Sequence, residues 1–352
     1  MKKFLALLLA LAMIVALAAC GQAAAPAAAP AEAAPAEAAP AEVELDPITI
    51  VFATPNADAN IESEFAQKWI AAVGEASGGK ITFDYTNSGA LGNYEELLEG
   101  TVNGIYDMTI TEPSYIETYV PESALLSLPM LYGSYDEATS ILDGEVGQWY
   151  NGLCKDAGLE VLNYFYCGFR YIISEKQLTS LDDCANVIIR SPNIQTYLDT
   201  LQMLGFKCET MAFSEAYTAM ETGVIEAVEC PLQNLYTNGY YNLCPYLLGS
   251  RHLLSANCIV ANEAFWAGLP AEYVEILTST LVDITTEERT ECEAREQQFL
   301  ADFATEGTTF SEFDADSTAK IVEMFSGYWT TKVETLGQDP LDMLNKIIAA
   351  KG

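Results

Sequence analysis

The chain has 352 residues, half of them hydrophobic, and a formal net charge of −34. This charge argues against a nucleic-acid partner, because phosphate contacts need lysine and arginine, and the chain has 16 of these against 50 acidic residues. We interpret the acid excess as a solubilising surface around a folded core. From residue 47 onward the chain is long enough for two lobes, each with its own core.

The N-terminus has the features of an export signal. Lys2 and Lys3 precede an apolar run over 4–18, which is too short to span a membrane as a helix of ~20 residues. Small residues then lead to Cys20, an arrangement that resembles a bacterial lipobox and predicts cleavage after residue 19 with lipid on the Cys20 sulfur. The alternative is an ordinary secretory signal with an incidental cysteine. Residues 20–46, rich in alanine, proline and glutamate, are expected to form a disordered tether.

Strand and helix patterns alternate from residue 48 to residue 111. The expected elements are strand 48–53, helix 62–76, strand 80–85, helix 94–103 and strand 107–111. This order is typical of an α/β protein with a mainly parallel sheet, in which ligands bind beyond the carboxyl ends of the strands. The residues expected just past strand ends are therefore candidate ligand contacts: Asn56, Tyr94, Glu112, Arg170 and Arg190.

A second α/β segment follows. The predicted elements are strands 159–165 and 171–174 on either side of Arg170, strand 186–190, helix 194–204, helix 214–222 with Ser214 as its N-cap, and strand 224–228. A strand over 255–261 should return to the first lobe. Apolar residues at helical spacing over 270–304 predict one unusually long helix, and terminal helices are expected within 311–352.

Arg190 is the most distinctive candidate for a binding residue. It follows the β-branched run 187–189, and it is one of only five arginines in a strongly acidic chain. A guanidinium is planar and forked, so it matches a carboxylate with two parallel hydrogen bonds. The structural alternative is an ion pair with Asp182 or Asp183 that fixes the end of the strand.

Four motifs, in this order, resemble those of the solute-binding proteins of tripartite ATP-independent periplasmic (TRAP) transporters, the DctP-like family. Gly89-Ala90-Leu91-Gly92 matches an early G-x-L-G turn, and Gly168-Phe169-Arg170 matches a G-x-R that closes a strand. The run NVIIRSP around Arg190 matches the strand with the family's carboxylate-binding arginine. The segment 213–231, FSEAYTAMETGVIEAVECP, matches a longer block that ends in E-N. The resemblance extends from about residue 48 to the C-terminus.

The resemblance implies an α/β, two-lobe fold like that of periplasmic binding proteins, with a long helix spanning both lobes. The expected lobes are 47–167 with 256–295, and 168–255 with 296–352. In this arrangement Arg190 would form the salt bridge to a substrate carboxylate. Arg170 would supply a second cation, and a structural ion pair between the lobes is the alternative for that residue.

The resemblance also implies roles for the neighbouring residues. Phe213 would pack beside the ligand, and Glu112 would receive hydroxyl or amino groups of the substrate. Tyr94 and Asn56 would add polar contacts. The alternatives are a core position for Phe213 and ordinary loop or turn positions for the other three.

Cys230 is the clearest departure from the family pattern, which has asparagine after the glutamate. A thiol is a weak hydrogen-bond donor and a poor acceptor. The pocket is therefore expected to lack one polar contact and to accept a less hydroxylated, more apolar acid. The aromatic run 164–166 favours the same conclusion.

Catalysis is the rival class of function, and the sequence offers little for it. The only histidine is His252, and we find no nucleophile elbow, zinc-protease motif or phosphate-binding loop. No cofactor is expected, and the widely spaced cysteines do not predict a metal site. Eight cysteines follow Cys20, and their apolar surroundings favour small buried side chains over disulfides.

The combined expectation is an extracytoplasmic solute-binding protein that captures a small organic acid and delivers it to a TRAP-type membrane permease. Its lipid anchor at Cys20 would hold it to the cell membrane, and no nucleic acid or catalytic reaction is expected. Two alternatives stay open: a substrate-binding lipoprotein of an ABC importer, and a ligand-sensing receptor subunit.

Overall fold

The computed structural model describes residues 45–351. The expected signal peptide (1–19), the lipidated Cys20 and nearly all of the 20–46 tether lie outside this range. Within 45–351, no helix combines the length and the apolar character that crossing a membrane requires.

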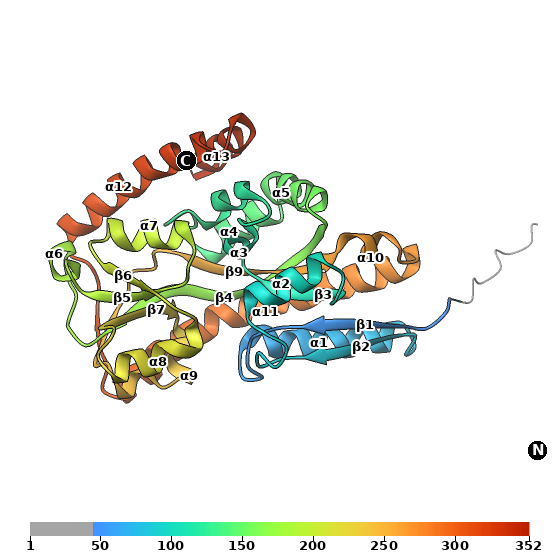
Figure 1. The fold of residues 1–352 in the computed structure, drawn as a ribbon, viewed down its shortest axis with the longest axis horizontal. Coiled ribbons are helices and arrows are strands. Elements are labelled where there is room, and N and C mark those ends of the chain that lie inside the picture. The colour runs from blue at the N-terminus through green and yellow to red at the C-terminus, as the bar shows by residue number, and fades with distance from the viewer. Residues whose placement is uncertain (1–44, 352) are drawn as a thin grey trace, which may run out of the picture. The chain divides into compact units, whose positions relative to one another are not determined.

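The first part of the sheet follows the predicted order. Strands β1 (Ile48–Ala53), β2 (Ile81–Thr86) and β3 (Met108–Thr111) are parallel, with β1 between the other two. Helices α1 (Ile61–Ala76) and α2 (Tyr94–Val102) connect them (Figure 1). The returning strand, predicted over 255–261, is β9 (Leu254–Asn262) and pairs antiparallel with β3. The prediction of an α/β fold is confirmed.

The largest difference from the sequence prediction is at Arg170. A single strand, β4 (Leu159–Ser174), replaces the two expected strands, so Gly168-Phe169-Arg170 lies inside a strand and does not close one. The strand continues because the register against β9 shifts between Tyr166 and Gly168, and Gly168 adopts a φ of 110° that suits glycine. The first half of β4 pairs with β9, and its second half pairs with β7 (Ala227–Pro231).

The second part of the sheet continues from β7 through β5 (Ile188–Ser191) to β6 (Lys207–Thr210), all parallel. Helix α7 (Gln195–Met203) follows β5, and α8 (Phe213–Glu221) follows β6. The predicted N-cap Ser214 is wrong: the cap is Ala212, whose backbone N–H donates to the Glu215 carboxylate at 3.0 Å. Strand β7 starts three residues later than predicted, because 224–226 complete the turn after α8.

Several short elements were not predicted individually. The additional helical segments are α3 (Pro113–Ile116), η1 (Pro121–Ser127), α4 (Tyr135–Leu142), α5 (Glu145–Asp156), α6 (Leu181–Cys184), α9 (Leu232–Thr237), η2 (Tyr240–Asn242) and α10 (Glu263–Ala267). The additional strands are β8 (Tyr246–Leu248), which pairs with β4, and β10 (Thr309–Ser311), which pairs with β8.

The predicted long helix is α11 (Ala271–Thr305), with 35 residues (Figure 1). It packs against α1, which connects strands of the first part of the sheet, against β4, and against α9, which follows β7 in the second part. Its contact with α1 includes a buried hydrogen bond from the indole N–H of Trp69 to the Leu277 carbonyl, at 3.2 Å. The helix therefore connects elements of both halves, as the resemblance implied.

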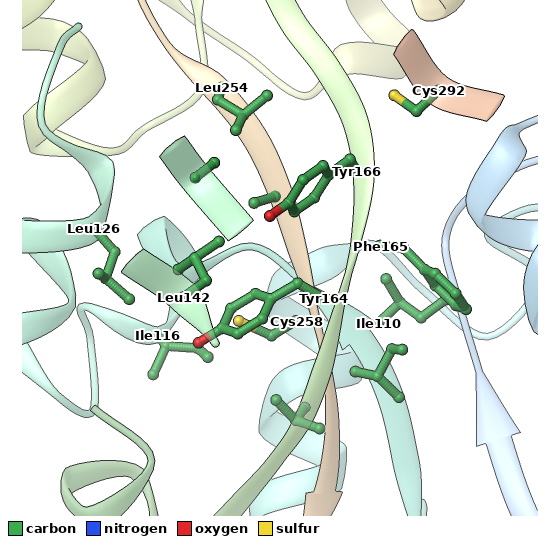
Figure 2. Packing of buried hydrophobic residues seen from close by; sticks show 14 of the residues in the cluster. Ile110, Ile116, Leu126, Leu142, Tyr164, Phe165, Tyr166, Leu254, Cys258 and Cys292 are labelled. Atoms are coloured by element: carbon green, nitrogen blue, oxygen red, sulfur yellow. The ribbon is translucent and has the colours of Figure 1, made fainter. Parts of the chain in front are cut away.

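The core continues on both faces of β4. Figure 2 shows Tyr164 and Tyr166 on one side of this strand and Phe165 on the other. All three rings belong to one large cluster of buried side chains, together with Ile110 and Cys258. Because both faces of β4 are covered, its sequence reads as a nearly continuous apolar run rather than an alternating one.

The terminal helices α12 (Ala315–Glu334) and α13 (Gln338–Lys351) contact both halves as well. Ile321 and Phe325 of α12 pack in a second cluster with Ile189 and Leu201. Further along α12, the indole N–H of Trp329 donates to the carbonyl of Pro129, at 2.7 Å. An ion pair between α13 and the start of α5 extends this connection.

Two glycines of α5 test how closely the start of this helix packs against the end of α4. A methyl group on Gly147 would clash with the backbone carbonyl of Leu142, whereas one on Gly152 would meet nothing within 4 Å. We expect Gly147→Ala to destabilise the protein by about 1–3 kcal/mol through overpacking. Gly152→Ala should stabilise it by about 0.5–1 kcal/mol, because alanine has the higher helix propensity. Urea unfolding of both variants measures the difference, and equal effects would contradict the described start of α5.

Candidate functional site

Two of the predicted residues lie together because their strands are parallel. Asn56 and Glu112 follow the carboxyl ends of β1 and β3, at the same edge of the sheet. Tyr94, the first residue of α2, joins them by donating its hydroxyl to Asn56 Oδ1, at 2.7 Å. Asn56 and Glu112 are buried, so these positions are not ordinary exposed loop sites.

Glu62 and Asn257 extend this polar group and were missed by the sequence analysis. The Glu62 carboxylate accepts hydrogen bonds from Asn56 Nδ2 (3.3 Å) and Asn257 Nδ2 (2.8 Å). Glu62 is fully buried, and burial raises the pKa of its carboxyl group. Its Oε2 and the Asn257 Oδ1 have no hydrogen-bond partner among the described residues. A glutamate at the start of an apolar helix was the only available signal.

Arg170 is held by Glu229 in a buried, bidentate ion pair. Its Nε lies 2.5 Å from Glu229 Oε2, and its Nη2 lies 2.8 Å from Oε1. The pairing follows from the sheet, because Glu229 on β7 stands opposite Ile172, which shares a face of β4 with Arg170. Nη1 donates to the Ser255 hydroxyl at 2.8 Å. This saturated geometry favours a structural role for Arg170, with its partner in Glu229.

His252 and the guanidinium together stabilise the charge on Glu229. Burial alone would raise the pKa of this carboxyl, but Arg170, helped by His252, lowers it to about 2. The His252 Nε2 lies 3.3 Å from Glu229 Oε2, and its Nδ1 lies 2.8 Å from the Ser250 hydroxyl. The single histidine is therefore a buried packing and hydrogen-bonding residue in this structure.

Glu112 lies on the other side of Arg170, with its Oε1 3.6 Å from Nη1. Its Oε2 accepts from the Tyr197 hydroxyl at 2.6 Å and from the Ser114 hydroxyl at 3.2 Å. We call Glu112, Arg170 and Glu229 the Arg170 cluster. Glu112 and Tyr197 also line a small cavity of about 10 Å³, which has room for about one water molecule.

Arg190 is buried but is not paired with a carboxylate. Its Nε and Nη2 both donate to one acceptor, the Met211 carbonyl, at 3.0 and 2.8 Å. The proposed alternative partner Asp183 instead accepts four hydrogen bonds from residues 179 and 180 at the start of α6. Among the described residues, Arg190 forms no salt bridge, and its Nη1 donates to no protein group. A guanidinium that is 4% exposed thus retains free donors.

An aromatic ring packs against this guanidinium, and further rings lie next to it in the fold. The Phe213 ring centre lies 5.6 Å from the Arg190 Cζ, within the range of a cation–π contact. Phe213 packs against Tyr240 with ring centres 5.9 Å apart, and Tyr115 of α3 stacks on Tyr94 at 5.0 Å. Phe213 is only partly buried, so part of its side chain is accessible. Tyr115 and Tyr240 are additional candidates that the sequence analysis did not single out.

Cys230 connects Arg190 to the Arg170 cluster. It follows Glu229 on β7, and β7 is the strand next to Arg190 on β5. Burial raises the pKa of its thiol to about 12, and the charges of Arg170, Glu229, Arg190 and Glu112 also act on it. Cys230 is therefore a neutral thiol on the strand that lies between the strands of Arg170 and Arg190. Among residues 45–351 the cysteines are all unpaired, and most of them are buried.

Comparison with known proteins identifies the family. Residues 52–335 match the family described as DctP, bacterial extracellular solute-binding protein, family 7. The chain is 23% identical to the C4-dicarboxylate-binding periplasmic protein DctP of Rhodobacter capsulatus over 298 residues, which cover 84% of this chain and 90% of that protein.

Two solved structures have the same fold. One is the sugar acid binding protein DctPAm of Advenella mimigardefordensis in complex with galactonate, with a TM-score of 0.79, 25% identity and coverage of 86% of this chain and 100% of that one. The other is a TRAP periplasmic solute-binding protein of Haemophilus influenzae with bound L-gulonate, with a TM-score of 0.81, 21% identity and coverage of 86% and 99%.

The chain therefore belongs to the DctP family of bacterial extracellular solute-binding proteins, and its fold is the two-lobe fold of the TRAP solute-binding proteins. The family prediction made from the motifs around residues 89–92, 168–170, 190 and 213–231 is confirmed.

The buried Arg170–Glu229 ion pair should contribute measurably to the stability of the folded protein. Glu229→Gln leaves the Arg170 charge without its bidentate partner, and we expect a loss of about 3–5 kcal/mol. Glu291→Gln, which breaks the solvent-exposed pair with Arg295, should cost less than about 1 kcal/mol. Chemical unfolding at pH 7 measures both variants, and equal losses would contradict the described role of Glu229.

The same pair predicts a pH dependence. The pKa of Glu229 in the folded protein is about 2, below the ordinary value of 4.5, so its stabilisation is present at neutral pH and lost as the pH falls from 4.5 toward 2. The stability difference between wild type and Glu229→Gln should therefore shrink over this interval. A difference that stays constant or grows would show that Glu229 is not the stabilising anion.

Proposed function

We propose that this protein captures a small organic acid by binding its carboxylate to Arg190 and delivers it to a TRAP-type membrane permease. The observation that carries the proposal is the unpaired charge of Arg190. The guanidinium is buried, shares one backbone acceptor between two of its nitrogens and contacts no acidic residue in the described range. Such a group is stabilised when an anion reaches its free donors.

The contrast with Arg170 supports the choice of clamp. Both arginines are 4% exposed, but among residues 45–351 Arg170 has two glutamates within 3.6 Å and Arg190 has none. An anionic ligand at Arg170 would have to compete with Glu229 for the same donors. We therefore assign Arg170 a positioning role, and we assign the direct carboxylate contact to Arg190.

The remaining predicted residues fit around this clamp. Phe213 offers an apolar face beside Arg190, and Cys230 supplies a neutral surface between the two arginines. Glu112, Tyr94 and Asn56 provide hydrogen-bonding groups from the other half of the sheet. The compared proteins are named for C4-dicarboxylates, galactonate and L-gulonate, and each of these ligands has a carboxylate.

We infer that binding closes two lobes, 47–167 with 256–295 and 168–255 with 296–352, over the ligand. Hinge closure of this kind sequesters a ligand and changes the outer surface, which would give the permease a distinct bound form to recognise. The Glu117 carboxylate, just after α3, accepts from the Thr196 hydroxyl of α7 at 3.0 Å and so connects the two proposed lobes.

Arg190 provides the direct test of the binding proposal. We expect Arg190→Ala to weaken carboxylate binding about a hundredfold, because the ligand charge loses its hydrogen-bonded partner. Arg295→Ala is the matched control, since that arginine is already paired with Glu64 and Glu291. A thermal-shift screen of monocarboxylates, dicarboxylates, keto acids, sugar acids and uncharged sugars finds a ligand, and calorimetry compares the variants. Binding of uncharged sugars alone, or unchanged affinity in Arg190→Ala, would contradict the proposal.

The proposed lipid anchor has its own test. Cys20 is the proposed site of lipid attachment, so Cys20→Ser should move the protein from the membrane fraction to the soluble exported fraction when it is expressed in a bacterium. Immunoblots of the two fractions measure this shift. Equal membrane association of wild type and variant would rule out an anchor at Cys20.

A further inference from the structure

The charges around the site are unevenly divided. The Arg170 cluster contains one guanidinium and two carboxylates, so its formal charge is −1. Arg190 adds +1, and the four groups together are neutral before any ligand binds. They share one region of the sheet, because β7 with Glu229 lies between β4 with Arg170 and β5 with Arg190, and Glu112 contacts Arg170.

The three other arginines of the chain are already paired with acidic residues. Arg251 is paired with Glu296, Arg289 with Asp143, and Arg295 with two glutamates. His252 is also a basic side chain, but it is buried against the Glu229 carboxylate. Among the described residues, Arg190 is therefore the one buried cation without an acidic partner.

Besides the charged groups above, the described surroundings hold aromatic rings and the polar group around Glu62, which is also acidic. Phe213 lies against Arg190 and packs on Tyr240, and the stacked pair Tyr94 and Tyr115 belongs to the other half of the sheet. Tyr115 packs against the small cluster that contains Tyr197. Aromatic rings offer apolar area to a ligand body, with hydroxyl groups only at their tips.

We infer that the ligand carries a single carboxylate on an apolar or aromatic body, and that this protein discriminates against dicarboxylates. The inference rests on the proposed function, because it takes Arg190 as the clamp and asks what else the ligand can carry. A single ligand carboxylate would pair with Arg190, which has no acidic partner among the described residues. A second carboxylate on the same ligand finds no free buried cation among the described residues, because Glu112 and Glu229 already contact the donors of Arg170.

The cost of that second charge is twofold. It must leave water without a cationic partner, and it approaches carboxylates of the same sign. Like charges brought together at a binding interface cost several kcal/mol, so we expect at least about a hundredfold weaker binding for a dicarboxylate than for the matched monocarboxylate.

Matched ligand pairs test the inference. Calorimetry at pH 7.5 would compare pentanoate with glutarate, hexanoate with adipate, and phenylacetate with 1,4-phenylenediacetate, on the full exported protein. Tighter binding of the monocarboxylate, by about a hundredfold in the pair that binds best, supports the inference. Equal or tighter binding of the dicarboxylate, still lost in Arg190→Ala, would overturn it and leave the carboxylate clamp intact. No binding by any carboxylate in these pairs, with Arg190→Ala unchanged for whichever ligand does bind, would overturn both.

A charge variant gives an independent readout. Glu112→Gln removes one negative charge from the Arg170 cluster with little change in shape, so dicarboxylate affinity should rise about tenfold relative to monocarboxylate affinity. Glu221→Gln, on the exposed surface of α8, changes the net charge equally and should leave this ratio unchanged. Thermal unfolding confirms that both variants fold. A ratio unaffected by Glu112→Gln would show that the cluster does not set the charge preference.

Discussion

A guanidinium removed from water needs negative charge or several acceptors, and the two buried arginines of this protein meet that requirement differently. Arg170 is saturated by Glu229 and Ser255 within the protein. Within the described part of the chain, Arg190 donates only to the carbonyl of Met211 and keeps donors free. One arginine is therefore part of the structure, whereas the other is available to an anion that comes from outside.

The backbone arrangement produces this difference. Strand β4 continues through the bulge at Gly168, so Arg170 lies within a paired strand and Glu229 of β7 reaches it across the ladder. Arg190 lies near the end of β5, next to the open end of the sheet. The carboxyl ends of β1 and β3 bring Asn56 and Glu112 to the same region, and α11 holds elements of both halves. This topology is typical of folds that bind ligands beyond the carboxyl ends of their strands.

Sequence patterns correctly predicted the features that depend on residues close together in the chain. The strand before Arg190 and the strand ends before Asn56 and Glu112 could be predicted, because hydrophobic periodicity and turn-forming residues depend on neighbours in the chain. The Arg170–Glu229 pair could not be predicted. The two residues are 59 positions apart, and they meet only because of the register between β4 and β7. Glu62 and Asn257 were missed for the same reason: their contact joins α1 to β9. The motif order identified the family, but it did not show which arginine is already neutralised.

A crystal structure with a bound carboxylate would show directly which arginine holds the ligand. We predict that the ligand carboxylate lies within hydrogen-bond distance of the Arg190 guanidinium, while Glu229 stays on Arg170 with both of its oxygens. A ligand carboxylate bound to Arg170 with Glu229 displaced, or one that contacts neither arginine, would contradict it.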